Sequence, residues 1–121
     1  MKILYDTSVL VPAVVTTHPN HALSLPQLEN ALRKDVLGFL SAHTLAELYS
    51  VATRLPVPHR VSPSNAQTII KNLLGYLRVV ALSAEDYQSV IAKMTALQLP
   101  GGVIFDALIA QAALNAKVDY L

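Results

Sequence analysis

The chain has 121 residues and a net charge of +1, with nine lysine and arginine residues against eight aspartate and glutamate residues. These totals lack the basic excess of a strongly nucleic-acid-binding domain, and the absence of cysteine excludes disulfide bonds and thiolate zinc sites. Apolar residues make up 53% of the chain and charged residues 14%, so we expect surplus apolar surface to lie in a partner interface. The length predicts a single domain over 1–121.

The longest stretch without charged residues does not have the pattern of a membrane helix. It covers 7–28 and contains Pro12, Pro19 and Pro26, which a spanning helix of about 20 apolar residues would not carry. A lysine at position 2 and an acid at position 6 are also unlike a signal peptide. The sequence therefore predicts a cytoplasmic protein with no membrane segment.

Apolar runs alternate with segments of helical spacing along the whole chain. The runs predict buried strands over 3–5, 36–40 and 76–82, and a fourth strand, cut short, over 118–121. Helical spacing predicts helices over 8–15, 20–34, 45–54, 64–74, 83–97 and 104–116. This alternation predicts an α/β fold of three layers (α/β/α), in which helices cover both faces of a central parallel sheet.

Polar residues at several boundaries predict how the helices begin. Thr7 or Ser8 could cap the first helix, and Asn20 could cap the second. Ser83, followed by Asp86 three residues later, is a near-match to a capping box. The segment 41–44 is predicted to end the second strand, ahead of the helix over 45–54.

Three of the acids have apolar surroundings. Asp6 follows the first strand, Glu47 lies one turn into the helix after the second strand, and Asp106 follows Phe105 at the start of the most apolar helix. Because the carboxyl ends of parallel strands meet at one edge of a sheet, we expect the three acids at one rim. Carboxylates that converge without cations repel one another unless a metal, water or protonation intervenes. Mg²⁺ and Mn²⁺ prefer such all-oxygen sites, although each acid alone could be a helix cap or a helix-face acid.

The segments KILYDTSVL, HTLAELYSV and FDALIAQAAL, with the terminal AKVDYL, resemble a PIN domain of the VapC-like toxin type. The resemblance covers essentially the whole chain. It implies a Mg²⁺- or Mn²⁺-dependent endoribonuclease, paired with an antitoxin protein and commonly a homodimer. It also implies that Asp6, Glu47 and Asp106 are the metal ligands and catalytic acids, with Thr7 or Ser8 as supporting polar side chains.

The chain departs from the family pattern at its end. Family members usually continue into a strand followed by another acid or asparagine, whereas this chain stops at Leu121. Either the chain is shortened and the fold lacks its C-terminal end, or a fourth ligand is dispensable. Asp119 precedes the expected strand and is interpreted as a turn acid.

The predicted chemistry is metal-assisted hydrolysis of an RNA phosphodiester, because a bound metal ion activates water without a protein nucleophile. His43, four residues before Glu47, is the histidine nearest the predicted rim. The main alternative is a degenerate PIN-like module that binds a partner protein or RNA without cutting. A receiver domain would need paired acids near the first strand, and a haloacid-dehalogenase-like phosphatase would need an aspartate where Ser8 stands.

Overall fold

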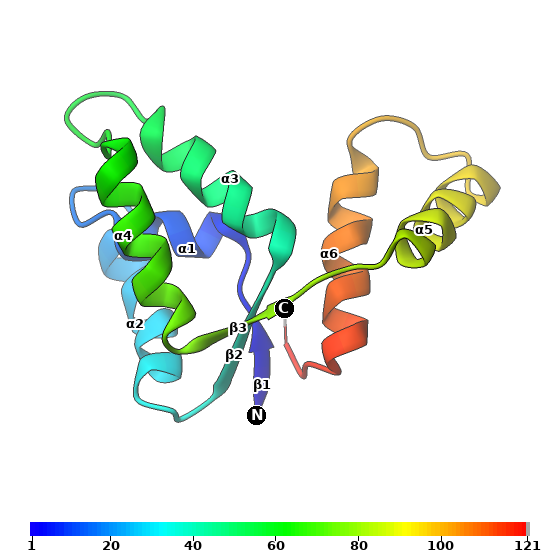
Figure 1. Ribbon diagram of the computed structural model, residues 1–121, viewed down its shortest axis with the longest axis horizontal. Helices are drawn as coiled ribbons and strands as arrows, with labels where there is room; N and C mark the ends of the chain where they lie inside the picture. The colour runs from blue at the N-terminus through cyan, green and yellow to red at the C-terminus, as the bar shows by residue number, and fades with distance from the viewer. Residues whose placement is uncertain (121) are drawn as a thin grey trace.

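The computed structural model describes residues 1–120, and these form a parallel sheet flanked by helices (Figure 1). The sheet has the strand order β1 (Lys2–Leu4), β2 (Leu37–Ser41) and β3 (Leu77–Val80), with β2 in the centre. The helices are α1 (Thr7–Val14), α2 (His21–Leu32), α3 (Ala42–Thr53), α4 (Pro63–Leu74), α5 (Ala84–Ala96) and α6 (Val103–Ala116). The predicted α/β class is confirmed.

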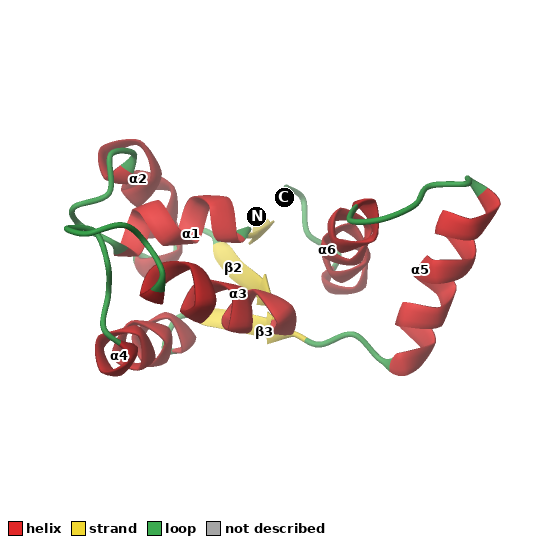
Figure 2. Cartoon of the chain, turned by 90° about the horizontal axis from the view of Figure 1, so that it is seen from above, coloured by secondary structure: helices red, strands yellow, loops and turns green. Residues whose placement is uncertain are grey.

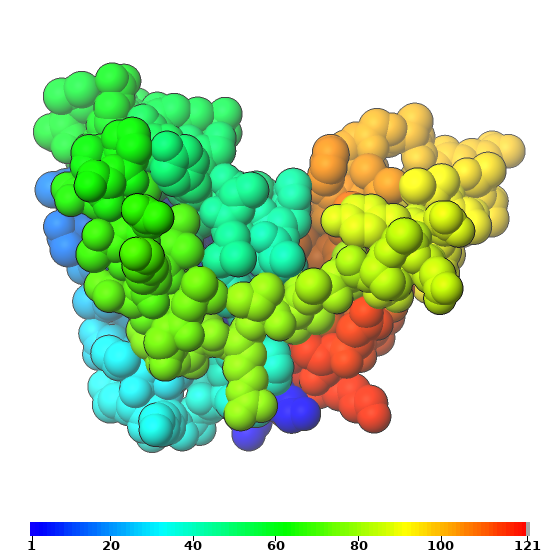
Figure 3. All heavy atoms as spheres, in the orientation of Figure 1, coloured from blue at the N-terminus to red at the C-terminus, as the bar shows by residue number. Residues whose placement is uncertain are grey.

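The helices form two unequal layers around the sheet. Helices α1 to α4 gather on one side, α6 packs against β2 and β3 on the other, and α5 lies outside α6 (Figures 1 and 2). The predicted three-layer arrangement is therefore confirmed. In the space-filling view the surface is notched between the side formed by α3 and the side formed by α6 (Figure 3).

Strand side chains alternate between the two layers, and this alternation divides the core. Tyr5 and Leu40 belong to a large buried cluster with residues of α1 to α4, whereas Leu4 and Phe39 pack with Ala112 of α6 in a smaller cluster. In α5 only Val90 is buried. The α5–α6 side is thus held by much less buried apolar surface than the α1–α4 side.

Large apolar side chains remain exposed on the α5–α6 side, as the composition predicted. They are Tyr87, Ile91, Leu97, Leu99, Val103, Phe105 and Leu114. In the part of the chain that the structure describes, no helix has both the length and the hydropathy needed to cross a bilayer.

The helix predicted from residue 45 begins at Ala42 instead. Strand β2 runs to Ser41, and α3 begins at the next residue because the Ser41 hydroxyl accepts a hydrogen bond from the Thr44 backbone N–H at 3.2 Å. Ser41 is therefore both the last residue of the strand and the helix cap. As a result Glu47 is the sixth residue of α3 and lies in its second turn.

The cap predictions have mixed outcomes. The capping box at α5 is confirmed, because the Ser83 hydroxyl accepts from the Asp86 N–H and the Asp86 carboxylate accepts from the Ser83 N–H. At α2, Asn20 occupies the cap position, but its side chain makes no cap hydrogen bond. At α1 the predicted caps are wrong: the helix already begins at Thr7, and Asp6 holds the cap position.

The last described residues return to β1. Tyr120 forms an isolated parallel bridge with Ile3, and the Asp119 carboxylate accepts a hydrogen bond from the Lys2 backbone N–H at 2.8 Å. The start of the predicted fourth strand is thus present at Tyr120, and Leu121 lies outside the described residues. The contact made by Asp119 agrees with its interpretation as a turn acid.

Gly38 should be needed for close packing between the sheet and α2. A Cβ atom at this position would lie 2.5 Å from Leu77 Cδ2 and 3.0 Å from both the Ala31 Cβ and the Tyr5 ring. We expect Gly38→Ala to lower the free energy of unfolding by about 1–3 kcal/mol, the usual cost of overpacking. Urea unfolding would measure this change. Gly102→Ala is the control and should have a smaller effect, because a Cβ there has no atom within 4 Å. Equal effects would contradict the packing argument.

Asp86 should make stability depend on pH. The hydrogen bond from the Ser83 backbone N–H holds the pKa of the Asp86 carboxyl below its usual value, and bonds from the Ser83 hydroxyl and Asn115 act in the same direction. The stabilisation is therefore present above the unfolded-state pKa of about 3.9 and is lost as pH falls through the lowered folded-state pKa. Unfolding of the wild type and Asp86→Asn between pH 6 and pH 2.5 should show a difference that shrinks in acid. A difference independent of pH would contradict this account.

Candidate functional site

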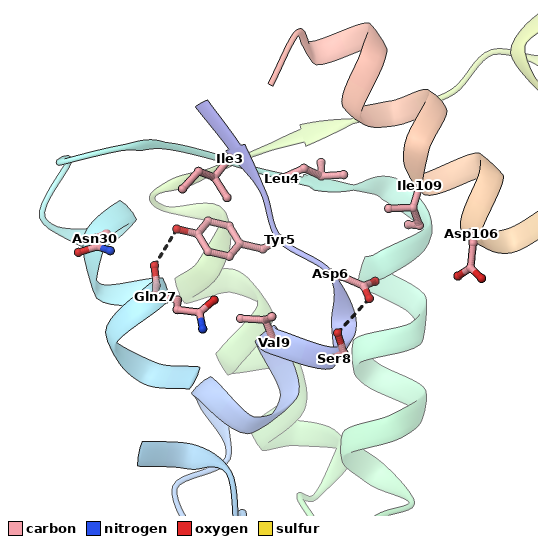
Figure 4. Close-up of a pocket in the computed structure, with 10 residues that line it drawn as sticks. All are labelled: Ile3, Leu4, Tyr5, Asp6, Ser8, Val9, Gln27, Asn30, Asp106 and Ile109. Atoms are coloured by element: carbon pink, nitrogen blue, oxygen red, sulfur yellow. Dashed lines mark hydrogen bonds between the residues drawn. The ribbon is translucent and has the colours of Figure 1, made fainter. Parts of the chain in front are cut away.

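A cavity of about 440 Å³ lies at the carboxyl end of β1, where the chain enters α1. Its two carboxylates come from opposite sides, Asp6 from the start of α1 and Asp106 from α6 (Figure 4). The other lining residues are Ile3, Leu4, Tyr5, Ser8, Val9, Gln27, Asn30 and Ile109. Two of the three predicted site acids therefore face the same space.

Asp6 is placed by the strand-to-helix junction. Its backbone is extended (φ −91°, ψ 160°), and its side chain makes no cap hydrogen bond to α1. Instead, one carboxylate oxygen accepts a hydrogen bond from the Ser8 hydroxyl at 3.0 Å (Figure 4). The capping role that the sequence left open for Asp6 is thus not the one it has in this structure.

Asp106 is the fourth residue of α6 and lies in its first turn, whereas the cap position belongs to Gly102. A carboxylate in the first turn interacts favourably with the helix dipole. The side chain is also exposed on the cavity side of the helix (Figure 4). Asp106 is therefore available to a ligand in the cavity.

Glu47 is directed to two neighbouring side chains. Its Oε2 accepts a hydrogen bond from the Thr7 hydroxyl at 3.3 Å, and its Oε1 lies 3.0 Å from His43 Nε2. Thr7 itself is buried and immediately follows Asp6. The two predicted supporting residues therefore contact two different acids, Ser8 binding Asp6 and Thr7 binding Glu47.

The full three-acid metal site stays a prediction. Among residues 1–120 no group of three or more His, Cys, Asp or Glu side chains is arranged to hold a metal ion. The pair Asp6 and Asp106 nevertheless fits Mg²⁺, which keeps several waters and often takes only one or two protein carboxylates. Both carboxylates line a cavity with room for those waters. Glu47 does not line this cavity, but it contacts Thr7, the residue that follows Asp6.

No lysine or arginine compensates the two aspartates within the described residues. The arginine salt bridges there join Arg33 to Glu29 and Asp35 at the end of α2. Two carboxylates that share a cavity without a cation repel each other and favour a bound cation.

Tyr5 closes the inner side of the cavity and was assigned from the sequence only to the core. Its hydroxyl donates to the Gln27 carbonyl at 2.7 Å (Figure 4). Burial raises the pKa of Tyr5, and the nearby Tyr76 raises it further. The cavity wall next to Asp6 is therefore neutral and tied to α2.

The sequence also did not reveal the partner of Phe105. This ring is 54% exposed and stacks on His43, with ring centroids 5.9 Å apart and an angle of 13° between the planes. The four-residue spacing between His43 and Glu47 indicated that these two lie on one side of a helix, but it gave no sign of the contact with Phe105.

Comparison with known proteins places this chain in a family. The family model described as PIN domain matches residues 3–121. The chain belongs to the PIN-domain family. Ribonuclease VapC40 from Mycobacterium tuberculosis is 32% identical over 116 residues, which cover 96% of this chain and 81% of VapC40. Ribonuclease VapC27 from the same species is 32% identical over 114 residues, covering 94% of this chain and 78% of VapC27.

Two solved structures share the fold of this PIN domain. The crystal structure of Mycobacterium tuberculosis VapC20, a Sarcin-Ricin loop cleaving toxin, has a TM-score of 0.71 at 14% identity and covers 98% of this chain and 85% of the other. VapBC2 from Rickettsia felis, crystallised with a DNA fragment from its promoter, has a TM-score of 0.63 at 20% identity and covers 99% and 86%. The predicted PIN-like fold and VapC-like resemblance are thus confirmed.

The cavity acids of this PIN domain should contribute little to its stability. We expect Asp6→Asn and Asp106→Asn to leave the free energy of unfolding unchanged or to raise it, because each substitution relieves repulsion between the two carboxylates. Chemical denaturation in metal-free buffer would measure the effect. Asp119→Asn is the contrasting control and should destabilise the protein, since its carboxylate binds the Lys2 N–H. Destabilisation by all three substitutions would show that Asp6 and Asp106 are structural.

Proposed function

We propose that this PIN domain is a Mg²⁺- or Mn²⁺-dependent endoribonuclease that hydrolyses RNA phosphodiester bonds and is the toxin of a toxin–antitoxin pair. The observation that carries the proposal is the placement of Asp6 and Asp106 on one cavity, in a chain 32% identical to two proteins named ribonucleases. RNA is the proposed substrate.

Asp6 and Asp106 would hold the metal ion, with Glu47 contributing directly or through water. When bound, such an ion lowers the pKa of a coordinated water and stabilises charge on the phosphoryl oxygens. Ser8 and Thr7 would orient Asp6 and Glu47 through the hydrogen bonds they already donate. A carboxylate of the site would accept the proton of the attacking water. The buried Tyr5 would exclude bulk water from the inner side.

The second candidate is a non-cleaving PIN-like module that binds a partner protein or RNA. One observation favours it: the described residues contain no ready-made group of three metal ligands, and Glu47 is held by Thr7 and His43. The two candidates differ in whether the purified chain cuts RNA.

We further propose an antitoxin protein and a second copy of this chain as partners, in the cytoplasm. The exposed large apolar side chains of α5 and α6 support a protein interface on that side of the molecule, because exposed apolar surface is often covered by a partner.

Cleavage by the purified chain should require a divalent metal. We expect cleavage of structured RNA with Mg²⁺ or Mn²⁺ and none with EDTA, measured by gel electrophoresis of end-labelled RNA. Asp6→Asn and Asp106→Asn should each lower the cleavage rate by more than about 100-fold. A loss of that size exceeds the effect that is usual when a residue that only hydrogen-bonds a metal ligand is removed. Both variants should also lose Mn²⁺ binding in titration calorimetry.

The controls separate the two candidate functions. Asp35→Asn removes an acid that lies on the exposed loop after α2, beside Arg33, and should leave cleavage unchanged. RNA binding without cleavage under any metal condition would establish the non-cleaving module instead. Cleavage that survives both EDTA and Asp6→Asn would contradict the proposed metal site.

A further inference from the structure

The two acids of the cavity belong to parts of the molecule that bury different amounts of apolar surface. Asp6 lies beside the large core cluster of the α1–α4 side, whereas Asp106 belongs to α6, which rests on the small cluster around Ala112. The first turn of α6 is especially open, since Val103 is 45% exposed and Phe105 is 54% exposed. A contact that holds this turn would therefore affect the geometry of the site.

The stack of His43 on Phe105 is such a contact. His43 lies in the first turn of α3, Phe105 lies in the first turn of α6, and their nearly parallel rings are 5.9 Å apart. Elsewhere the two helices diverge, and the surface between them is notched (Figures 1 and 3). Stacked aromatic rings at such a separation attract each other.

The same imidazole also contacts the third predicted acid. Nε2 of His43 lies 3.0 Å from Oε1 of Glu47, and an ionised carboxylate can only accept a hydrogen bond, so Nε2 donates. With Thr7 on Oε2, both carboxylate oxygens of Glu47 have partners. One side chain thus touches Glu47 through its nitrogen and the residue before Asp106 through its ring face.

We propose that His43 is a positioning residue that fixes the orientation of Glu47 and the place of Asp106 relative to it. The proposal rests on the proposed metal-dependent function of the same site. It differs from a simple structural role because the two contacts set the separation of two acids that come from different layers of the fold. Phe105 is the second half of this device, the His43–Phe105 clamp.

Three substitutions separate the two contacts. His43→Gln keeps a donor within reach of Glu47 at the same helical spacing but removes the ring. His43→Phe keeps the ring but removes the donor. Phe105→Leu keeps an apolar side chain but removes the stack. His18→Ala is the matched control, since it breaks another ring pair, His18 with His59 at 6.5 Å, away from the acids.

The experiment measures Mn²⁺ affinity by calorimetry and the kcat and KM of RNA cleavage for each variant, with unfolding midpoints as a check of folding. We expect His43→Phe to weaken Mn²⁺ binding about 10-fold, as is typical when a hydrogen-bond partner of a ligand is lost. We also expect His43→Gln and Phe105→Leu each to lower kcat several-fold while KM stays within about 2-fold. The double variant His43→Gln/Phe105→Leu should have a kcat no lower than that of either single variant, because both substitutions break the same stack.

The outcomes distinguish this proposal from the proposed function. Wild-type affinity and kcat in all folded variants would overturn the positioning role while leaving the ribonuclease intact. If the wild type binds Mn²⁺ but cuts no RNA, the ribonuclease is wrong, and weaker binding by His43→Phe still supports the clamp. No Mn²⁺ binding by the wild type would overturn both. Should His43→Phe fail to fold, wild-type kcat in both His43→Gln and Phe105→Leu would overturn the positioning role, and a several-fold loss in both would support it.

Discussion

The parallel pairing of β1 with β2 is the constraint on which the rest of the structure depends. Leu4 lies opposite Phe39, and the Tyr5 N–H donates to the Phe39 carbonyl at 2.8 Å, which continues the pairing to the residue before Asp6. Because the two strands run in the same direction, their helices α1 and α3 start at the same edge of the sheet. The contact between Thr7 and Glu47 is a direct consequence.

The residues at the ends of these strands make the junctions short. Ser41 ends β2 and caps α3, so no loop separates the strand from the helix. Asp6 occupies the cap position of α1 without capping it by a side-chain bond, which leaves its carboxylate to Ser8 and the cavity. Buried Thr7 and Thr44 lie beneath these junctions. The polar groups at this rim thus lie at the ends of strands and helices rather than on loops.

The opposite side of the cavity has a different character. Helix α6, which contains Asp106, packs against the sheet through the small cluster around Ala112. Helix α5 adds one buried residue, Val90, and the hydrogen bond that Asn115 of α6 donates to Asp86. Elements with little buried apolar area have lower local stability. The His43–Phe105 stack is a contact between these two sides of the molecule. A partner that covered the exposed apolar residues of α5 and α6 would also raise the local stability of this side.

Much of the fold followed from local patterns in the sequence, because strand and helix periodicity and the Ser83–Asp86 spacing depend on neighbouring residues. The three motifs around Asp6, Glu47 and Asp106 also pointed to the family. The start of α3 did not follow, since Ser41 could be recognised as a cap only once the end of β2 was known. The sequence by itself therefore determined the order of elements, the family and the candidate acids. Only the tertiary structure decided that Asp6 and Asp106 share a cavity, that Glu47 is held by Thr7 and His43, and that Phe105 stacks across to α3. Those contacts join residues of different layers, and their geometry depends on packing that no local pattern contains.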